Sequence, residues 1–360
     1  MALAHRLLDE FLSTHPDSHS LTLIVTTRSA SKGAATITRL TKHLRSLSPS
    51  SLDRVTLTHY SVDLTNLSSV FGLSKDLIRS YDRLDFIILN AGMGSFNGID
   101  WLYCFSMLWN NWIHAVTYPA YKIQEVGWTT TQQIPLGEKI GTVFAANVFG
   151  HYFLVHELMA LLSRGRGRII WTSSLEAYSQ SLSLSDIQGL SAIQSYESSK
   201  RLIDVLSLTS ALPSTSPFTS TFFSPSSTGI TGKRPKMYLS HPGVCGTGII
   251  PLNIILFYCM IFATYIARWF GSPWHPIQTY SGAKAATWFA LAPEAELESK
   301  SAGGTKWGSA CSRTGQEFVK ATPVDNEGED GWEDLGRDCW RMMEDLRMSW
   351  KKRLEALESG

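Results

Sequence analysis

The sequence predicts an α/β fold with a largely parallel sheet. Short β-branched or apolar runs alternate along the chain with longer segments of helical spacing, a pattern typical of parallel strands joined by crossover helices. The composition, 44% hydrophobic and 18% charged, is that of a chain that can bury a core. A length of 360 residues allows either one large α/β domain or two average domains.

The expected elements follow in chain order. The first is an amphipathic helix, in which Leu3, Leu7, Leu8, Phe11 and Leu12 recur at helical spacing. Strands are expected at residues 21–28 (a buried one), in runs ending at Asp63, Asn90 and Ser174, and at 236–243. Helices are expected at residues 31–47, after Asp63, from residue 141 on, at 196–212 and at the C-terminal end.

A single domain is expected over residues 1–322, followed by an acidic linker and an amphipathic helix at 323–360. Three segments stand out within the domain: an insertion rich in Trp and Tyr, a Ser/Thr/Pro-rich surface loop expected to be flexible, and an apolar segment at the place of a substrate lid. They cover residues 96–141, 213–231 and 249–275.

Charge and cysteine usage exclude several classes of protein. The 32 basic residues nearly balance 31 acidic ones, which argues against a nucleic-acid-binding protein. The five cysteines are odd in number and form no CxxC pair, so neither a metal site nor a disulfide framework is expected, and a reducing compartment fits. The first twenty residues lack the pattern of a secretory signal.

A tyrosine four residues before a lysine occurs at residues 118–122, 196–200 and 280–284. On base rates, one such match is expected by chance in about every two chains of this composition. Ketone reduction makes a stricter demand: a phenol must face the carbonyl oxygen, with a cation on the same helix face and a second hydroxyl donor nearby.

The neighbouring residues favour Tyr196 as the acid. A strand ending in Ser173 and Ser174 precedes it, and a strand followed by a Pro-Gly turn comes after it. Tyr280 has no such neighbours, so we expect its helix to pack on the core through Trp288 and Phe289. Pro119 argues against a helix at Tyr118.

Taken together, these motifs resemble the short-chain dehydrogenase/reductase family. The matching stretches are "NAG" at 90–92, Asn147, the serine pair, "YESSK" and "PGVCGT" at 242–247. Within the family the chain is similar to the fungal 3-keto-sterol reductases of sterol C-4 demethylation, on the aromatic insertion, "ANVFGHY", "YESSKR" and "ARWFGSPWH" at 267–275. The resemblance implies a Rossmann-like, doubly wound parallel sheet.

The resemblance also implies a role for each catalytic position. Tyr196 would protonate the substrate carbonyl, and Ser174 would hydrogen-bond its oxygen. Lys200 would hold the nicotinamide ribose and lower the pKa of Tyr196. Asn147 would bend its helix and hold a water in the proton relay.

The implied cofactor is NADPH. Asp63 would meet the adenine amine, the backbone near Asn90 would line the cofactor, and Pro242, Gly243 and Thr247 would hold the carboxamide side of the nicotinamide. Arg28 stands where NAD-selective relatives place an acid, and a guanidinium there suits a 2′-phosphate. The alternative for Arg28 is a solvated arginine at a strand end.

One departure from the family pattern concerns the N-terminus. The family opens with a central strand and a Gly-rich TGxxxGxG turn that binds the pyrophosphate, whereas residues 1–12 match the helix that should follow that turn. The sheet is therefore predicted to miss its first, central strand. Either a further N-terminal piece precedes Met1, or the chain is a decayed and inactive copy.

The uncharged run from Ile249 to Ala267 allows three interpretations. It could be a helix that crosses a membrane, since 19 residues at 1.5 Å each span roughly 28 Å, or a buried core helix. We favour a helix lying in one leaflet, with Arg268, Trp269 and Trp274 at the interface.

We therefore expect an NADPH-dependent reductase of a 3-keto sterol or a related triterpenoid. It would act at a membrane surface, on the cytoplasmic face of the endoplasmic reticulum or a lipid droplet, near other enzymes of sterol C-4 demethylation. The alternative from another class is an inactive, truncated homologue that serves as a membrane-bound scaffold.

Overall fold

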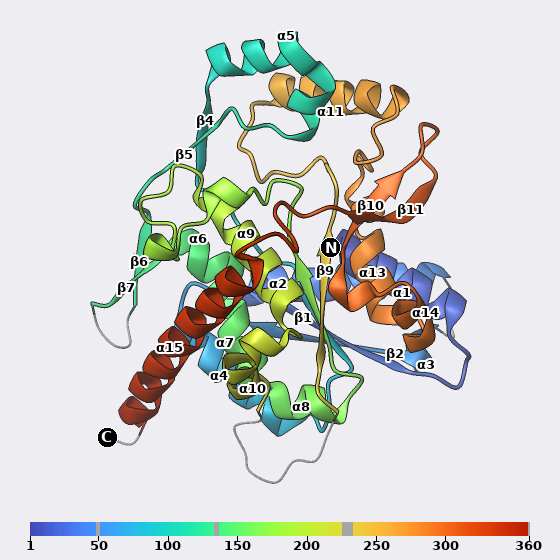
Figure 1. Cartoon of the computed structure of the whole chain (residues 1–360). Helices are drawn as coiled ribbons and strands as arrows, with labels where there is room; N and C mark the ends of the chain where they lie inside the picture. Colours follow the sequence, from blue (N-terminus) through green and yellow to red (C-terminus); the bar gives the residue numbers. More distant parts are fainter. Residues whose placement is uncertain (48–50, 133–136, 225–232, 359–360) are drawn as a thin grey trace.

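The computed structural model describes residues 1–47, 51–132, 137–224 and 233–358 (Figure 1). Its strands are β1 (Leu21–Thr27), β2 (Val55–Ser61), β3 (Phe86–Leu89), β4 (Phe96–Ile99), β5 (Lys122–Gln124), β6 (Thr129–Thr131), β7 (Lys139–Gly141), β8 (Arg168–Thr172), β9 (Lys236–His241), β10 (Lys306–Cys311) and β11 (Glu317–Thr322).

The described helices cover both faces of the sheet. They are α1 (Ala2–Thr14), α2 (Ala30–Leu47), α3 (Ser51–Arg54), α4 (Leu67–Ser80), α5 (Trp101–Thr117), α6 (Thr142–Phe144), a π-helix (Ala145–Phe149), α7 (Gly150–Glu157), α8 (Met159–Arg164), α9 (Ser195–Thr209), α10 (Ser216–Phe223), α11 (Ile254–Trp269), α12 (Thr279–Gly282), α13 (Lys284–Leu291), α14 (Glu294–Ser299) and α15 (Trp332–Glu358). Short 3₁₀ turns lie at 179–181, 184–186, 213–215 and 302–304.

The central sheet has five strands in the order β11-β10-β9-β8-β3, and β1 and β2 form a parallel pair of their own. Strands β3, β8, β9 and β10 are mutually parallel, which confirms the predicted α/β class with crossover helices. In this five-stranded sheet β11 runs antiparallel to its neighbour, as the second strand of a hairpin with β10.

Side chains along β8 and β9 alternate between two hydrophobic cores. Ile169 and Trp171 of β8 face one core with α4, α7, α9 and α15, whereas Ile170 faces the other with α1, α2 and α13. In β9, Met237 and Leu239 face the first core and Tyr238 faces the second. This alternation, with helices on both faces, is the doubly wound arrangement that the resemblance implied.

A strand was predicted at residues 21–28 and is present as β1, but the prediction that this strand is buried is wrong. Only Leu21 of β1 is buried, because in the described residues β1 hydrogen-bonds to β2 alone and has no strand partner on its other edge. The sheet is thus interrupted between β1 and β3, where the missing central strand was expected. That a strand is missing there stays a prediction.

The predicted flexible loop at 213–231 is helical over much of its described part, and its residues from 225 on lie outside the described ones. Helix α10 begins with Pro217 in its first turn, a position that proline favours. Phe222 and Phe223 of this helix are buried against Trp340 of α15. Aromatic burial therefore prevailed over the loop-like composition.

The C-terminal helix α15 joins the main core rather than forming a unit of its own. Trp340, Met343, Trp350 and Leu354 on one face are buried, so the helix is amphipathic as expected. The β10–β11 hairpin was not predicted, although the "SRTGQ" turn between two short runs with β-branched and aromatic residues is a signal for it.

Helices α5 and α11 lie side by side at the top of the molecule in Figure 1, where Trp112 meets Phe270 at 5.4 Å between ring centroids. Of the sixteen residues of α11, Thr264 and Ala267 are buried, so its interpretation as a core helix is wrong. Within the described ranges, none of the helices combines the length and apolarity needed to cross a bilayer.

Candidate active site

Tyr196 lies in the first turn of α9, a helix buried along its whole length. Gln194 caps this helix without a side-chain hydrogen bond, and the N–H of Tyr196 instead donates to Oε1 of Gln124 in β5 at 2.9 Å. That bond satisfies one of the N–H groups that a helix leaves unpaired at its start. The inserted segment 96–141 thus holds the first turn of α9.

Lys200 follows Tyr196 by one turn on the same helix. Its Nζ lies 5.5 Å from the centroid of the Tyr196 ring and donates to the Thr172 carbonyl at 2.8 Å. Burial lowers the pKa of Lys200 to about 8, while Asp204 opposes the shift and Lys306 adds to it. The predicted pairing of phenol and ammonium on one helix face is confirmed.

The two serines after β8 have different partners. The Ser174 side chain lies beside the Tyr196 phenol and acts to lower its pKa, and Ser174 Oγ accepts the Glu176 N–H at 3.2 Å. Ser173 Oγ donates instead to buried Asp204, which Lys306 of β10 also contacts at 2.6 Å. The second serine is therefore the one beside the phenol, as expected.

Asn147 sits in the middle of the π-helix at Ala145–Phe149, which confirms the expected irregularity of its helix. Its Nδ2 donates to the Met93 carbonyl and to Ser199 Oγ, both at 2.9 Å, and its Oδ1 accepts the Met93 N–H at 2.8 Å. Asn147 thereby fixes the turn after β3 against α9. The water relay itself stays a prediction.

The expected low pKa of Tyr196 is not what the structure shows. Burial raises the pKa of this phenol most, and the carboxylates of Glu176 and Glu197 raise it further, while the hydrogen bond from Ser174 opposes them. A phenol with a raised pKa stays protonated at neutral pH, so Tyr196 is ready to donate its proton.

The predicted cofactor positions fall into two groups. Asn90, Pro242, Gly243 and Thr247 follow β3 and β9, which flank β8, so they lie along the same edge of the sheet as Ser174. Gly243 has a φ of +67°, and a Cβ there would lie 2.8 Å from the Ser309 carbonyl oxygen, so only glycine fits.

Arg28 and Asp63 lie beyond the carboxyl ends of β1 and β2. Asp63 Oδ1 accepts from the backbone N–H and hydroxyl of Thr65, whereas exposed Arg28 has no side-chain partner within the described ranges. No described contact joins either residue to the group around Tyr196, so their place in one site with that group stays a prediction.

Two observations test whether a nicotinamide nucleotide fits these residues. A Cβ on Gly92 would stand 3.1 Å from Asn147 Oδ1 and 3.7 Å from Lys200 Nζ, so this turn leaves bare backbone beside the ammonium. The exposed guanidinium of Arg28 suits a 2′-phosphate. The residues present fit the nicotinamide riboside and the adenosine phosphate, while the Gly-rich turn that would bind the pyrophosphate is not in the sequence.

The other two tyrosine–lysine patterns have other uses. Tyr280 Oη donates to Asp9 at 2.8 Å and Lys284 Nζ donates to Glu10 at 3.0 Å, so both side chains hold α1. Trp288 and Phe289 are buried, which confirms the packing expected of that helix. Lys122 from the third pattern reaches Tyr196, with Nζ 5.6 Å from the ring centroid.

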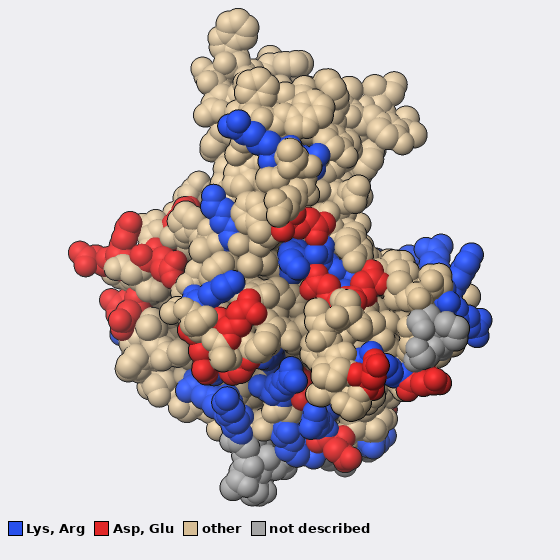
Figure 2. All heavy atoms as spheres, turned by 90° about the vertical axis from the view of Figure 1, so that its right-hand side faces the viewer, with Lys and Arg blue, Asp and Glu red and all other residues tan. Residues whose placement is uncertain are grey.

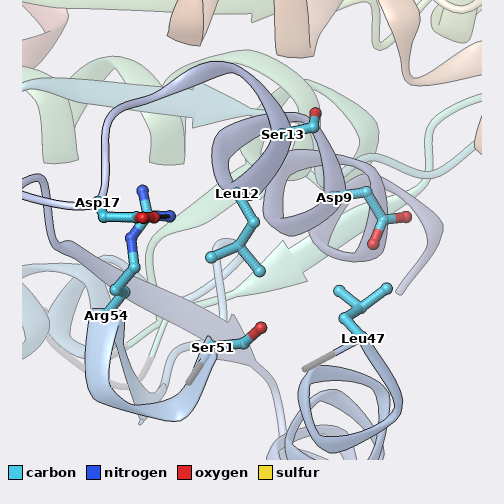
Figure 3. A pocket seen from close by; sticks show the side chains of 7 residues that line it. All are labelled: Asp9, Leu12, Ser13, Asp17, Leu47, Ser51 and Arg54. Carbon is cyan, nitrogen blue, oxygen red and sulfur yellow. Dashed lines mark hydrogen bonds and ion pairs between the residues drawn. The ribbon is translucent and has the colours of Figure 1, made fainter. Parts of the chain in front are cut away.

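A cavity of about 340 Å³ lies away from this group of residues, near the amino ends of β1 and β2 (Figure 3). Its charged side chains have partners: Arg54 is 2.7 Å from Asp17, and Asp9 is 2.6 Å from His43. Because parallel α/β sheets place their sites at the carboxyl ends of the strands, we assign no chemistry to this cavity.

No family model matches the chain. A 3-keto-steroid reductase of Aspergillus fumigatus is 42% identical over 98% of this chain and 92% of the relative. The 3-keto-steroid reductases of Gibberella zeae and Kluyveromyces lactis are each 32% identical over 98% of this chain, and over 91% and 92% of their own lengths.

Solved structures give only weak matches. A metagenomic short-chain oxidoreductase in complex with NADP has a TM-score of 0.40 at 15% identity, covering 81% of this chain and 85% of that one. An uncharacterised protein of Mycobacterium paratuberculosis has a TM-score of 0.49, also at 15% identity, covering 93% of this chain and 96% of that one. We draw nothing from either match.

Proposed function

The chain belongs to the 3-keto-steroid reductases, and we propose that it reduces the ketone of a 3-keto sterol or a related triterpenoid to the alcohol with NADPH. One observation supports this most directly. The hydroxyl of Ser174, the phenol of Tyr196 and the ammonium of Lys200 form one group at the carboxyl end of the central strands.

The chemistry follows from these groups. NADPH, when bound, would supply the hydride for the carbonyl carbon. The Ser174 hydroxyl would stabilise the negative charge that develops on the carbonyl oxygen by a hydrogen bond. The Tyr196 phenol gives its proton to the same oxygen. Lys200 keeps a positive charge next to the phenolate that remains, and Asn147 holds the turn that carries Gly92.

The test uses the purified chain with a 3-keto sterol and NADPH, with the alcohol measured by mass spectrometry. We expect Tyr196→Phe to lower kcat by roughly 10²–10⁴-fold, the range found for general acids. Tyr280→Phe is the matched control, since it removes the hydroxyl of another tyrosine–lysine pattern and should keep activity. Equal activity of wild type and Tyr196→Phe would refute the assignment.

We propose that Arg28 selects NADPH over NADH through the 2′-phosphate. The support is its exposed guanidinium just beyond the end of β1. Arg28→Ala should raise the KM for NADPH about tenfold or more, as expected for losing a charged hydrogen-bonded pair, and should leave the KM for NADH unchanged. Equal use of both cofactors by the wild type would contradict this role.

The alternative, a scaffold without activity, predicts a different response to the cofactor. A reductase should be stabilised by about 2.7 kcal/mol at an NADPH concentration of 100 times Kd, which thermal unfolding detects. A scaffold that does not bind NADPH should show no shift.

We also propose that the chain binds a membrane surface through α5 and α11. Large apolar side chains on both helices face solvent: Leu102 is 86% exposed, Trp109 91% and Ile254 71%. In Figure 2 the upper projection formed by these helices is nearly free of charge, with a few basic side chains. A patch of this kind is typical of interfacial helices.

This surface would let a sterol pass from the bilayer to the reductase without crossing water. The proposed location is the cytoplasmic face of the endoplasmic reticulum or a lipid droplet, beside other enzymes of sterol C-4 demethylation.

A further inference from the structure

A buried group of charges lies directly beside Tyr196. Lys122 Nζ is 2.7 and 2.6 Å from the two carboxylate oxygens of Glu176 and 3.0 Å from Glu197 Oε1. Gln124 Nε2 donates to Glu197 Oε2 at 2.5 Å. The side chains of Lys122, Glu176 and Glu197 are 3%, 12% and 1% exposed. We call these three residues the buried triad.

The buried triad joins three parts of the chain. Lys122 comes from β5 in the inserted segment 96–141, Glu176 from the loop two residues after Ser174, and Glu197 from α9 directly after Tyr196. The Glu176 N–H also donates to Ser174 Oγ at 3.2 Å. The triad therefore touches the insertion, the serine loop and the catalytic helix at once.

Stability alone is a poor explanation for such a group. Taking charges out of water costs several kcal/mol per ion, and well-packed apolar residues often replace a buried ion pair without loss. Two carboxylates here share one ammonium, which leaves a negative charge next to the phenol. Lys122 Nζ is 5.6 Å and Lys200 Nζ 5.5 Å from the Tyr196 ring centroid, so two cations also lie close to the phenol.

We propose, on the basis of the function above, that Glu176 is a positioning residue for ketone reduction. Lys122 holds Glu176 in place, and the charge of Glu176 controls how readily Tyr196 gives up its proton. Because Lys122 belongs to the inserted segment 96–141, that segment also influences how readily Tyr196 gives up its proton. Glu197 lies in the "YESSK" stretch of the resemblance, but nothing in the sequence indicates that it meets Lys122 and Glu176.

The charges around Glu176 give this control a direction. Burial raises the pKa of Glu176 to about 7, against the attraction of Lys122 and with the repulsion of Glu197. The ionised Glu176 raises the pKa of Tyr196. Below about pH 7, Glu176 is therefore neutral and Tyr196 donates more readily, and above it Tyr196 holds its proton more tightly. The titratable groups that face Glu176 are Lys122, Glu197, Tyr196, Tyr121 and Tyr178.

The test variant is Glu176→Gln, which keeps an oxygen for Lys122 and cannot ionise. In the wild type, kcat for the 3-keto sterol should fall as the pH rises through about 7, and in Glu176→Gln this inflection should vanish. The matched control is Glu125→Gln, an exposed carboxylate on the same insertion, which should keep the inflection. An unchanged inflection in Glu176→Gln would overturn the proposal.

A second readout does not need activity. The pKa of Glu176 is higher in the folded chain, about 7, than its ordinary value of 4.5, so the folded chain holds an extra proton between these pH values. The stabilisation that this extra proton gives is complete below about pH 4.5 and is lost as the pH rises to about 7. The thermal midpoint of the wild type should therefore fall relative to that of Glu176→Gln between about pH 4.5 and 7. Above about pH 7 the difference between the two midpoints should stay constant.

Glu125→Gln should run parallel to the wild type in this thermal measurement. Parallel midpoints of wild type and Glu176→Gln would overturn the proposal even for a chain without activity. If the thermal difference is present but the wild type does not reduce the ketone, the proposed function is refuted and the proposal for Glu176 is not.

Discussion

At the scale of single residues, Lys122 is shared by two carboxylates, Glu176 and Glu197, that have been removed from water. Its own pKa is raised, because Glu176 and Glu197 outweigh the effect of burial, which alone would lower it. The ammonium therefore stays charged over the whole physiological range of pH. Removing that charge would leave Glu176 and Glu197 buried with no cation between them.

We expect Lys122→Met to destabilise the protein by about 3–5 kcal/mol, the cost of leaving buried charges unpaired. Lys122→Arg should recover part of this loss, because it keeps the charge. The free energy of unfolding is measured by urea titration. Lys139→Met is the control, an exposed lysine on β7 of the same insertion, and should change it by less than about 0.5 kcal/mol. A similarly small effect of Lys122→Met would show that the triad contributes nothing to folding.

The sequence predicted the catalytic group better than its surroundings. Tyr196, Lys200 and Ser174 were found because a helix turn and a strand end place them by local rules. Lys122 was seen only as the end of a third pattern, since its contact with Glu176 spans 54 residues. Long-range pairing of buried charges leaves no periodic signal, so the triad could not be predicted.

At the scale of elements, α5 and α11 present an apolar surface that the sequence predicted only in part. The run 249–267 indicated α11 through its lack of charge, whereas α5 was seen only as part of an aromatic insertion. Packing of Trp112 on Phe270 brings the two together, although they are far apart in the chain. The exposed surface belongs to the pair, and a membrane would meet both helices.

We expect Leu102→Asp and Trp109→Asp each to weaken binding to phosphatidylcholine vesicles by about tenfold or more, because burying one large apolar side chain is worth ~1.5–3 kcal/mol. Stability should not change, since both side chains are exposed. The measurement is co-sedimentation with vesicles. Ile193→Asp is the matched control, a 76% exposed apolar residue outside the two helices, and should bind as the wild type does. Equal binding by all variants would exclude this surface as the anchor.

At the scale of the whole molecule, the strands differ in whether they have a hydrogen-bonded strand on both sides or on one side in the described residues. Strand β8 lies between β3 and β9 and is buried over four of its five residues. Strand β1 is parallel to β2, and no other strand in the described residues pairs with it. The alternation of strands and helices predicted the order of the elements correctly, but burial follows from the neighbours that each strand has.

This difference predicts unequal local stability. We expect the amides of β1 to exchange with deuterium faster than those of β8 by about tenfold or more, a factor that corresponds to ~1.4 kcal/mol in opening free energy. Exchange followed by mass spectrometry of peptides covering 21–27 and 168–172 measures it, with the β9 peptide as the control, since β9 also has partners on both sides. Equal protection of β1 and β8 would show that something pairs with the free edge of β1. In that case NADPH should be tested next, because a cofactor that orders this edge would slow exchange in β1 and leave β8 unchanged.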